Sequence, residues 1–224
     1  MLTQADVARQ NMIENQVRPW EVLDARVLDV LGAVRREDFV PAKYRAVAFA
    51  DMALPIGHGE TMMKPTVEGR LLQALALGSD DRVLEIGTGS GFVTACLARL
   101  ARSVTSVEQH ADLAETARAR IAAAGAHNVR IEHADAVRQF DTGERFDAVV
   151  VTGAVHALLG PFANHGVSMT RLESRPSRMG RWEYYFFVDV EGHEKDAKVG
   201  AALAELRALA PFVKLLGSYP AATH

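Results

Sequence analysis

Hydrophobic and polar positions follow two different rhythms along the chain, and the rhythm changes after residue 152. Before that point, short apolar runs predict strands at 82–86, 103–108, 129–134 and 146–152. Between the first three runs, apolar residues at three- and four-residue spacing predict helices at 91–101 and 113–125. Strands that alternate with helices in this way predict parallel βαβ units with right-handed crossovers, and the scarcity of polar residues in the strands predicts burial on both faces.

The segments before the first strand have a different pattern. The first 50 residues predict helices, which are interrupted at RPW and REDFVP. A Gly- and Pro-rich stretch, ALPIGHGETMMKP (53–65), then predicts a long irregular loop, and loops of this length in a compact domain are often functional. A further amphipathic helix is expected over 66–77.

After residue 152 the order of elements no longer fits a doubly wound domain. A short helix is expected to end at Gly166, and two strands of alternating polarity, 167–175 and 182–192, are expected to form a hairpin. A helix over 196–210 and a last strand over 212–220 follow.

Composition narrows the class of protein. The 224 residues carry a formal charge of −3, which gives no reason to expect attraction to nucleic acid or to an anionic membrane. Cys96 is the single cysteine, so no intrachain disulfide can form, and the eight histidines lack metal-ligand spacing, so no metal is expected. Without a signal peptide or a long apolar run, the expected compartment is the cytoplasm.

The stretch VLEIGTGSG (83–91) carries the most informative motif. Glycines between a buried strand and a helix let the chain turn sharply, and they let a ligand approach the backbone at the positive end of the helix. Their G-x-G-x-G spacing differs from the G-x-G-x-x-G of dinucleotide-binding proteins. Glu108 ends the second strand, where a carboxylate can accept ribose hydroxyls, and Asp135 follows the third, where it can accept from an adenine amino group. All three features belong to the carboxyl ends of adjacent parallel strands, where open α/β sheets bind ligands.

This combination resembles the class I S-adenosylmethionine-dependent methyltransferases. The resemblance implies S-adenosyl-L-methionine as cofactor. Its implied binding residues are Glu85, Gly87, Thr88, Gly89, Ser90, Gly91, Glu108, Gln109, Asp135 and Ala136. The alternative is that Glu108 and Asp135 only cap helices.

The segments VRREDFVP, ADMALPIGHGETMMKPTVEGRLLQAL and DRVLEIGTGSGFVTACLARLA resemble a protein-L-isoaspartate O-methyltransferase, from about residue 9 to 154. The resemblance implies methylation of isoaspartyl residues in a protein or peptide, with Thr61 and Met63 in the catalytic loop. Such a carboxylate is already ionised at neutral pH, so the reaction depends mainly on orientation. Met63 stands where the family has a serine, and a methionine cannot donate a hydrogen bond to the substrate. We therefore expect weak or absent isoaspartyl activity.

The C-terminal part resembles another family. HALLGPFANHGVSMTRLESRPSRMGRWEYYFFVDVEGH, followed by FVKLLGSYPAA, resembles the regulatory ACT domain of prephenate dehydratases over about 155–222. The resemblance implies an L-phenylalanine effector, with homodimerisation through this segment as a possibility. The implied effector-binding residues are Gly153, Ala154, Val155, Glu173, Ser174, Arg175 and Pro176. The alternative is an inherited hairpin that binds nothing.

The predicted fold class is therefore α/β, with a Rossmann-like parallel methyltransferase sheet that stops after its fourth strand and is continued by a ferredoxin-like ACT βαββαβ segment. We expect a methyltransferase-like domain with a helical N-terminal region at 1–154, and an ACT-like regulatory segment at 146–224 that shares strand 146–152. Because a strand has two edges, this sharing predicts one mixed sheet. Its strands would follow the order 129–134, 103–108, 82–86, 146–152, 182–190 and 167–175, with 182–190 antiparallel to 146–152. The strand at 212–219 would then lack its usual partner.

Two functions remain open on sequence alone. The first is an S-adenosylmethionine-dependent carboxyl O-methyltransferase of the isoaspartyl type with an appended ACT-like module. The second is a non-catalytic hybrid that binds S-adenosylmethionine, its demethylated product or an aromatic amino acid.

Overall fold

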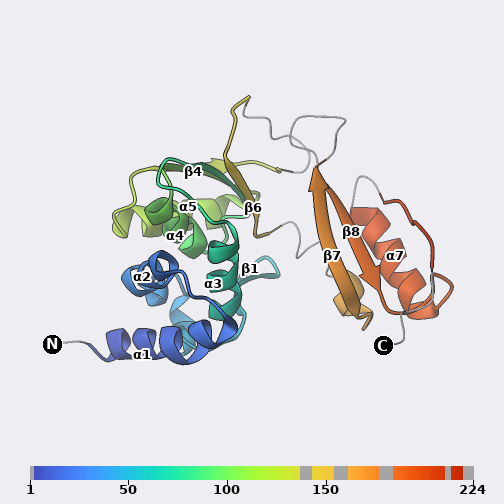
Figure 1. Ribbon diagram of the computed structural model, residues 1–224, viewed down its shortest axis with the longest axis horizontal. Helices are drawn as coiled ribbons and strands as arrows, with labels where there is room; N and C mark the ends of the chain where they lie inside the picture. Colours follow the sequence, from blue (N-terminus) through green and yellow to red (C-terminus); the bar gives the residue numbers. More distant parts are fainter. Residues whose placement is uncertain (1–2, 137–142, 154–160, 177–183, 210–212, 219–224) are drawn as a thin grey trace. The chain divides into compact units, whose positions relative to one another are not determined.

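The computed structural model describes residues 3–136, 143–153, 161–176, 184–209 and 213–218 (Figure 1). The chain divides into two compact units, Met1–Ala154 and Val155–His224.

The N-terminal unit begins with short helices, as the apolar spacing predicts. Thr3 caps the first helix in a capping box with Asp6, and Asp24 caps the second through the Arg26 backbone N–H. The first helix continues through a π-helical and a 3₁₀ turn, and two further 3₁₀ turns follow the second. The bounds are α1 (Gln4–Met12), η1 (Ile13–Val17), η2 (Arg18–Trp20), α2 (Ala25–Ala33), η3 (Arg36–Asp38) and η4 (Ala42–Val47).

The Gly- and Pro-rich stretch forms a β-hairpin rather than an irregular loop. Strands β1 (Leu54–Gly57) and β2 (Glu60–Met62) pair antiparallel, and α3 (Pro65–Ala74) follows them. His58 at the tip has φ of 54°, an unusual value for a residue with a side chain. The expectation of an irregular loop was therefore wrong. The two strands are too short for an alternation of polar and apolar residues to show in the sequence.

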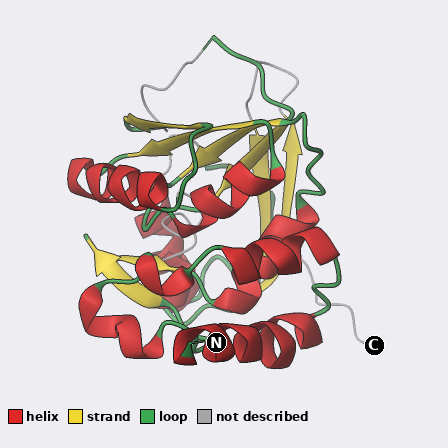
Figure 2. Cartoon of the chain, turned by 90° about the vertical axis from the view of Figure 1, so that its left-hand side faces the viewer, coloured by secondary structure: helices red, strands yellow, loops and turns green. Residues whose placement is uncertain are grey.

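Four parallel strands form the sheet of this unit, in the order β5-β4-β3-β6. This arrangement confirms the predicted βαβ units and their strand order. Helices α4 and α5 lie beneath the sheet, and α2 packs against the side of α4 that is turned away from the sheet (Figure 1). Figure 2 shows the same layering, with helices below the strands of the sheet. The bounds are β3 (Arg82–Ile86), α4 (Phe92–Leu100), β4 (Ser103–Glu108), α5 (Ala111–Ala123), β5 (Val129–His133) and β6 (Ala148–Val151).

One hydrophobic core joins the N-terminal helices to the sheet. It includes Leu31 from α2, Leu72 from α3, Leu97 from α4 and Val104 from β4. Burial of each such side chain contributes about 1.5–3 kcal/mol relative to its exposure to water. The helical region and the sheet therefore fold as one body.

The C-terminal unit contains the predicted hairpin and helix. Strands β7 (Met169–Pro176) and β8 (Tyr184–Val190) pair antiparallel, residues 161–164 are helical, and α7 spans Ala197–Leu209. A small core contains Phe162, Val167, Val199, Ala202 and Leu203.

One expectation for the C-terminal part was wrong, because residues 213–218 contain no strand, although one was expected over 212–220. An extended segment with no neighbouring strand has no ladder hydrogen bonds to form. β7 and β8 form a two-stranded sheet, as the predicted hairpin requires, and β6 pairs with β3. The predicted continuation of the parallel sheet through pairing of β8 with β6 is not confirmed.

Glu85 in β3 is a fully buried carboxyl group that connects three elements. Its Oε2 accepts hydrogen bonds from Thr94 Oγ1 of α4 at 2.5 Å and from Ser106 Oγ of β4 at 2.6 Å. Its Oε1 has no hydrogen-bond partner among the described residues. Burial raises the pKa of Glu85 to about 7, while the two hydroxyl donors act in the opposite direction. Folding therefore favours the protonated form.

We predict that Glu85→Gln reduces the pH dependence of stability between pH 5 and 8. The raised pKa makes the native state hold a proton that the unfolded state releases, so the free energy of unfolding of the wild type falls as pH rises towards and through 7. The glutamine cannot ionise, so its loss over this range should be smaller by on the order of 2 kcal/mol. Urea unfolding at several pH values measures this difference.

Glu132→Gln is the matched control, because the Glu132 side chain on β5 is 41% exposed. It should follow the wild-type pH profile. Equal slopes for the wild type and Glu85→Gln would contradict the prediction.

Candidate functional site

The Gly-rich loop between β3 and α4 approaches the end of β6. Gly87 has φ of 102° and donates its backbone N–H to the Val107 carbonyl at 2.8 Å. A Cβ on Gly87 would lie 2.5 Å from the backbone nitrogen of Gly153, which follows β6. A residue with a side chain would force these two segments apart, so glycine is required by both conformation and space.

Glu108 lies at the end of β4 with its carboxylate held by two backbone donors. Oε2 accepts from the Gly89 N–H at 2.8 Å, and Oε1 accepts from the His110 N–H at 2.9 Å. The residue is 4% exposed, so its carboxylate is fixed between the Gly-rich loop and the start of α5. A carboxylate has about four acceptor positions, so Glu108 keeps capacity for ligand hydroxyls.

Gln109, Asp135 and Ala136 lie at the same edge of the sheet. The Ala134 N–H donates to the Glu108 carbonyl at 3.0 Å, which holds the segment before Asp135 beside the end of β4. Asp135 and Ala136 are half-buried, and Gln109 is exposed. The structure therefore gathers the loops after β3, β4 and β5 where the sequence predicts a nucleotide-like ligand.

Three of the predicted cofactor residues have side chains that face away from solvent. Glu85 is enclosed by Thr94 and Ser106, and the Thr88 and Ser106 hydroxyl oxygens are 2.6 Å apart. Ser90 is 6% exposed and accepts from the Phe92 N–H at the start of α4. These side chains make their contacts inside the protein, and a role of the loop backbone in ligand binding stays a prediction.

The β1–β2 hairpin lies against the Gly-rich loop and the start of α5. A Cβ on Gly89 would be 3.1 Å from Ile56 Cδ1. The His58 ring stacks on His110 with centroids 4.0 Å apart, and His58 Nε2 lies 2.9 Å from each Asp112 carboxylate oxygen. The hydrogen bond from His58 lowers the pKa of Asp112 below its usual value. The hairpin thus covers one side of the predicted cofactor site.

Sequence reasoning did not single out these hairpin contacts. The available signal was a histidine between two glycines, which permit the tight turn that brings His58 to α5.

The predicted catalytic loop residues lie on and just after β2. Thr61 and Met63 are half-buried, and the Met63 side chain packs against the main core. The Met63 carbonyl accepts from Arg36 Nη2 at 2.8 Å, a contact that the sequence did not reveal.

The predicted effector residues are only partly described. The Gly153 N–H donates to the Ile86 carbonyl at 3.1 Å, whereas Ala154 and Val155 lie outside the described residues. Residues 173–176 belong to β7 and pair with residues 184–187 of β8. In the described part of the chain, no group of three or more His, Cys, Asp or Glu residues could hold a metal ion, and no helix is long and apolar enough to cross a membrane.

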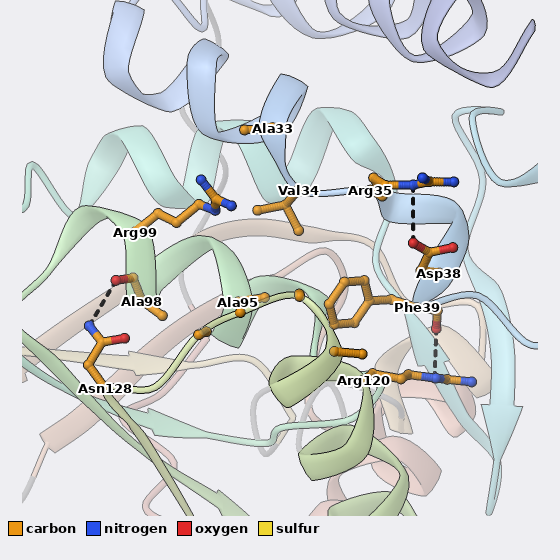
Figure 3. Close-up of a pocket in the computed structure, with 14 residues that line it drawn as sticks. Ala33, Val34, Arg35, Asp38, Phe39, Ala95, Ala98, Arg99, Arg120 and Asn128 are labelled. Atoms are coloured by element: carbon orange, nitrogen blue, oxygen red, sulfur yellow. Dashed lines mark hydrogen bonds and ion pairs between the residues drawn. The ribbon is translucent and has the colours of Figure 1, made fainter. Parts of the chain in front are cut away.

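A hollow of about 540 Å³ lies elsewhere in the N-terminal unit (Figure 3). The ends of α2, α4 and α5 line it, close to where β4 and β5 begin and therefore away from the carboxyl ends of the strands. Arg120 Nη1 donates to the Phe39 carbonyl at 2.7 Å, and Asn128 Nδ2 donates to the Ala98 carbonyl at 2.9 Å. Partial burial lowers the pKa of Arg120. This hollow is distinct from the site that the Gly-rich loop and Glu108 form.

Comparisons with known proteins agree with both resemblances. Residues 7–162 match the family model of protein-L-isoaspartate(D-aspartate) O-methyltransferase, and residues 151–208 match that of the ACT domain. A protein-L-isoaspartate O-methyltransferase of Methylorubrum populi is 42% identical over 153 residues, which are 68% of this chain and 72% of the relative. One from Rhodopseudomonas palustris is 41% identical over 64% of this chain and 58% of the relative, and one from Methanoculleus marisnigri is 40% identical over 65% and 66%. The matched part thus spans from just over half to about three quarters of these relatives.

Solved structures support the fold. A protein-L-isoaspartate O-methyltransferase has a TM-score of 0.56 at 23% identity and covers 64% of this chain and 47% of its own. A Plasmodium falciparum protein described as a putative protein-L-isoaspartate O-methyltransferase, solved with S-adenosyl-L-homocysteine, has a TM-score of 0.55 at 22% identity, with coverages of 64% and 72%. The match over residues 7–162 covers more than half of the chain, and the chain belongs to the protein-L-isoaspartate(D-aspartate) O-methyltransferase family.

Proposed function

We propose that the N-terminal unit is an S-adenosyl-L-methionine-dependent methyltransferase that esterifies the carboxylate of isoaspartyl residues. The observation that carries the proposal is the buried Glu108 carboxylate, held by the Gly89 and His110 backbone N–H groups at the carboxyl edge of the sheet. Family membership supports this function over the binding-only alternative.

The residues of this edge fit the parts of the cofactor. Glu108 accepts hydrogen bonds from the ribose hydroxyls, Asp135 accepts from the adenine amino group, and Gln109 and Ala136 border these contacts. The backbone from Gly87 to Gly91 lies beside the rest of the molecule, at the positive end of α4. Bound S-adenosylmethionine supplies a methyl group on a sulfonium sulfur.

The protein's main task in the reaction is to align the acceptor. A carboxylate oxygen of the substrate forms the new bond to the methyl carbon, the carbon–sulfur bond breaks, and its electron pair remains on sulfur. No proton is transferred, so no general base is needed. Thr61 orients the substrate carboxylate, Met63 offers it no hydrogen-bond donor, and the hairpin that carries Thr61 excludes water from one side. The exposed Lys64 attracts the anionic substrate.

The second part of the proposal concerns the C-terminal unit. We propose that the segment from 146 to 224 is an ACT-like module that shares strand 146–152 with the methyltransferase domain at 1–154 and binds an aromatic amino acid such as L-phenylalanine. The ACT match, the β7–β8 hairpin and helix α7 support this assignment. The regulatory ACT domain that this segment resembles has its phenylalanine site at a subunit interface, which supports the proposal of a homodimer.

Glu108→Ala should weaken binding of S-adenosylhomocysteine by about 10- to 100-fold, because two hydrogen bonds to a charged acceptor are lost. Isothermal calorimetry measures the dissociation constant. Glu132→Ala, on the neighbouring strand β5, should change it less than twofold. An unchanged constant in a folded Glu108→Ala protein would refute the cofactor site.

Met63→Ser should raise kcat/KM for an isoaspartyl peptide by about tenfold, since the hydroxyl restores a donor to the substrate carboxylate. A methyl-transfer assay with radiolabelled cofactor measures the rate. Met63→Ala removes the same side chain without adding a hydroxyl and should give no increase. A similar gain in both variants would show that space, not the hydrogen bond, limits the wild type.

L-phenylalanine should bind the full chain with saturable heat in calorimetry, whereas L-alanine should not, because only the former fills an apolar slot. Absence of a phenylalanine signal at millimolar concentration would argue against the effector assignment and leave the methyltransferase proposal intact.

A further inference from the structure

Arg36 in η3 is a fully buried arginine whose guanidinium group contacts several separate segments. Nε donates to the Ala48 carbonyl at 2.8 Å, Nη2 donates to the Met63 carbonyl at 2.8 Å, and Nη1 forms an ion pair with Glu68 of α3. The guanidinium carbon also lies 5.0 Å from the centre of the Phe92 ring.

These contacts join the two loops between which a methyl group would pass. Met63 is the residue directly after β2, on the side where the acceptor is expected. Phe92 is the first residue of α4, directly after Gly91 of the Gly-rich loop. The guanidinium group of Arg36 therefore fixes Met63, in the segment expected to hold the methyl acceptor, relative to α4, the helix that follows the Gly-rich loop.

The charges around Arg36 make this arrangement rigid. Glu68 is 1% exposed, and burial raises its pKa to about 7 while the ion pair with Arg36 acts in the opposite direction. Removal of either partner leaves an uncompensated buried group, which is strongly destabilising. Asp51 stabilises the start of α3 next to this pair, because its Oδ1 accepts from the Thr66 hydroxyl at 2.7 Å. The backbone after β2 thus has little freedom to shift.

A second buried arginine provides a comparison within the same unit. Arg9 in α1 is 7% exposed and pairs with Glu37 at 2.5 Å, and it also donates to the Gly32 carbonyl at 3.4 Å. Its hydrogen-bond partners all belong to the N-terminal helical region. The two buried pairs are similar in burial and chemistry, but only Arg36 contacts the segment after β2.

We infer that Arg36 is a positioning residue for methyl transfer, which holds the Thr61–Met63 segment in line with the cofactor loop through the Met63 carbonyl and the Phe92 ring. The inference rests on the proposed methyltransferase function. A misplacement of about 1 Å at a reacting group can lower a rate by about 10²-fold. A lysine at position 36 keeps one charge for Glu68 but has no planar fork with which to reach both carbonyls.

The test compares Arg36→Lys with Arg9→Lys in the full chain. Both variants weaken a buried ion pair and should lose similar stability in urea. Arg36→Lys should lower kcat for an isoaspartyl peptide by about 10²-fold, with the KM for S-adenosylmethionine within about threefold of the wild type. Arg9→Lys should keep kcat within about threefold. Glu68→Gln keeps the size of the carboxyl group and should lower kcat as well, which covers the case in which Arg36→Lys fails to fold.

Hydrogen–deuterium exchange separates failure of this inference from failure of the proposed function. If the wild type transfers no methyl group, the proposed reaction is wrong, but the positional role is still tested by the backbone amides of residues 60–64. Arg36→Lys should speed their exchange at least tenfold relative to Arg9→Lys. Equal exchange in the two variants, or equal kcat where the wild type is active, would overturn the inference.

Discussion

The close approach of Gly87 to Gly153 is the constraint on which the rest of the site depends. With no side chain on either residue, the loop after β3 and the turn after β6 come within a distance that a single Cβ would prohibit. Thr152 adds a hydrogen bond from its hydroxyl to the Gly87 carbonyl at 2.5 Å. The loop is held there so that Gly89 reaches Glu108, and Glu108 in turn connects the loop to α5. The loops at this edge of the sheet are therefore held by a series of contacts that begins at Gly87 and Gly153.

Much of the N-terminal unit could be predicted because its signals are local and strong. Buried parallel strands such as β3 and β4 are short apolar runs, and the helices between them have regular apolar spacing. The order β5-β4-β3-β6 is the one that the resemblance to methyltransferases implies. The place of Glu108 at the end of β4 was predicted for the same reason, because the apolar run that forms this strand ends at this residue.

The features that could not be predicted from the sequence depend on contacts between segments that are far apart in the chain. Arg36 looks like any charged residue in a polar stretch, and only the fold shows that Ala48, Met63 and Glu68 meet around it. The Glu85 side chain accepts hydrogen bonds from Thr94 and Ser106, contacts that a strand pattern alone does not indicate. The β7–β8 hairpin could be predicted because its strands are neighbours in sequence, whereas any further partner of β8 depends on long-range pairing that neither family pattern specifies.

The place of β6 in the sheet has a consequence for how such a chain can arise. β6 completes the contacts of the cofactor loop through Thr152 and Gly153, and it follows every other element of that half in sequence. A genetic exchange after Gly153 therefore leaves the contacts of the Gly-rich loop with Thr152, Gly153 and Glu108 in place, whatever module is attached. Protein engineers could use the same position as a fusion point, with retention of S-adenosylhomocysteine binding as the selection for correct joining.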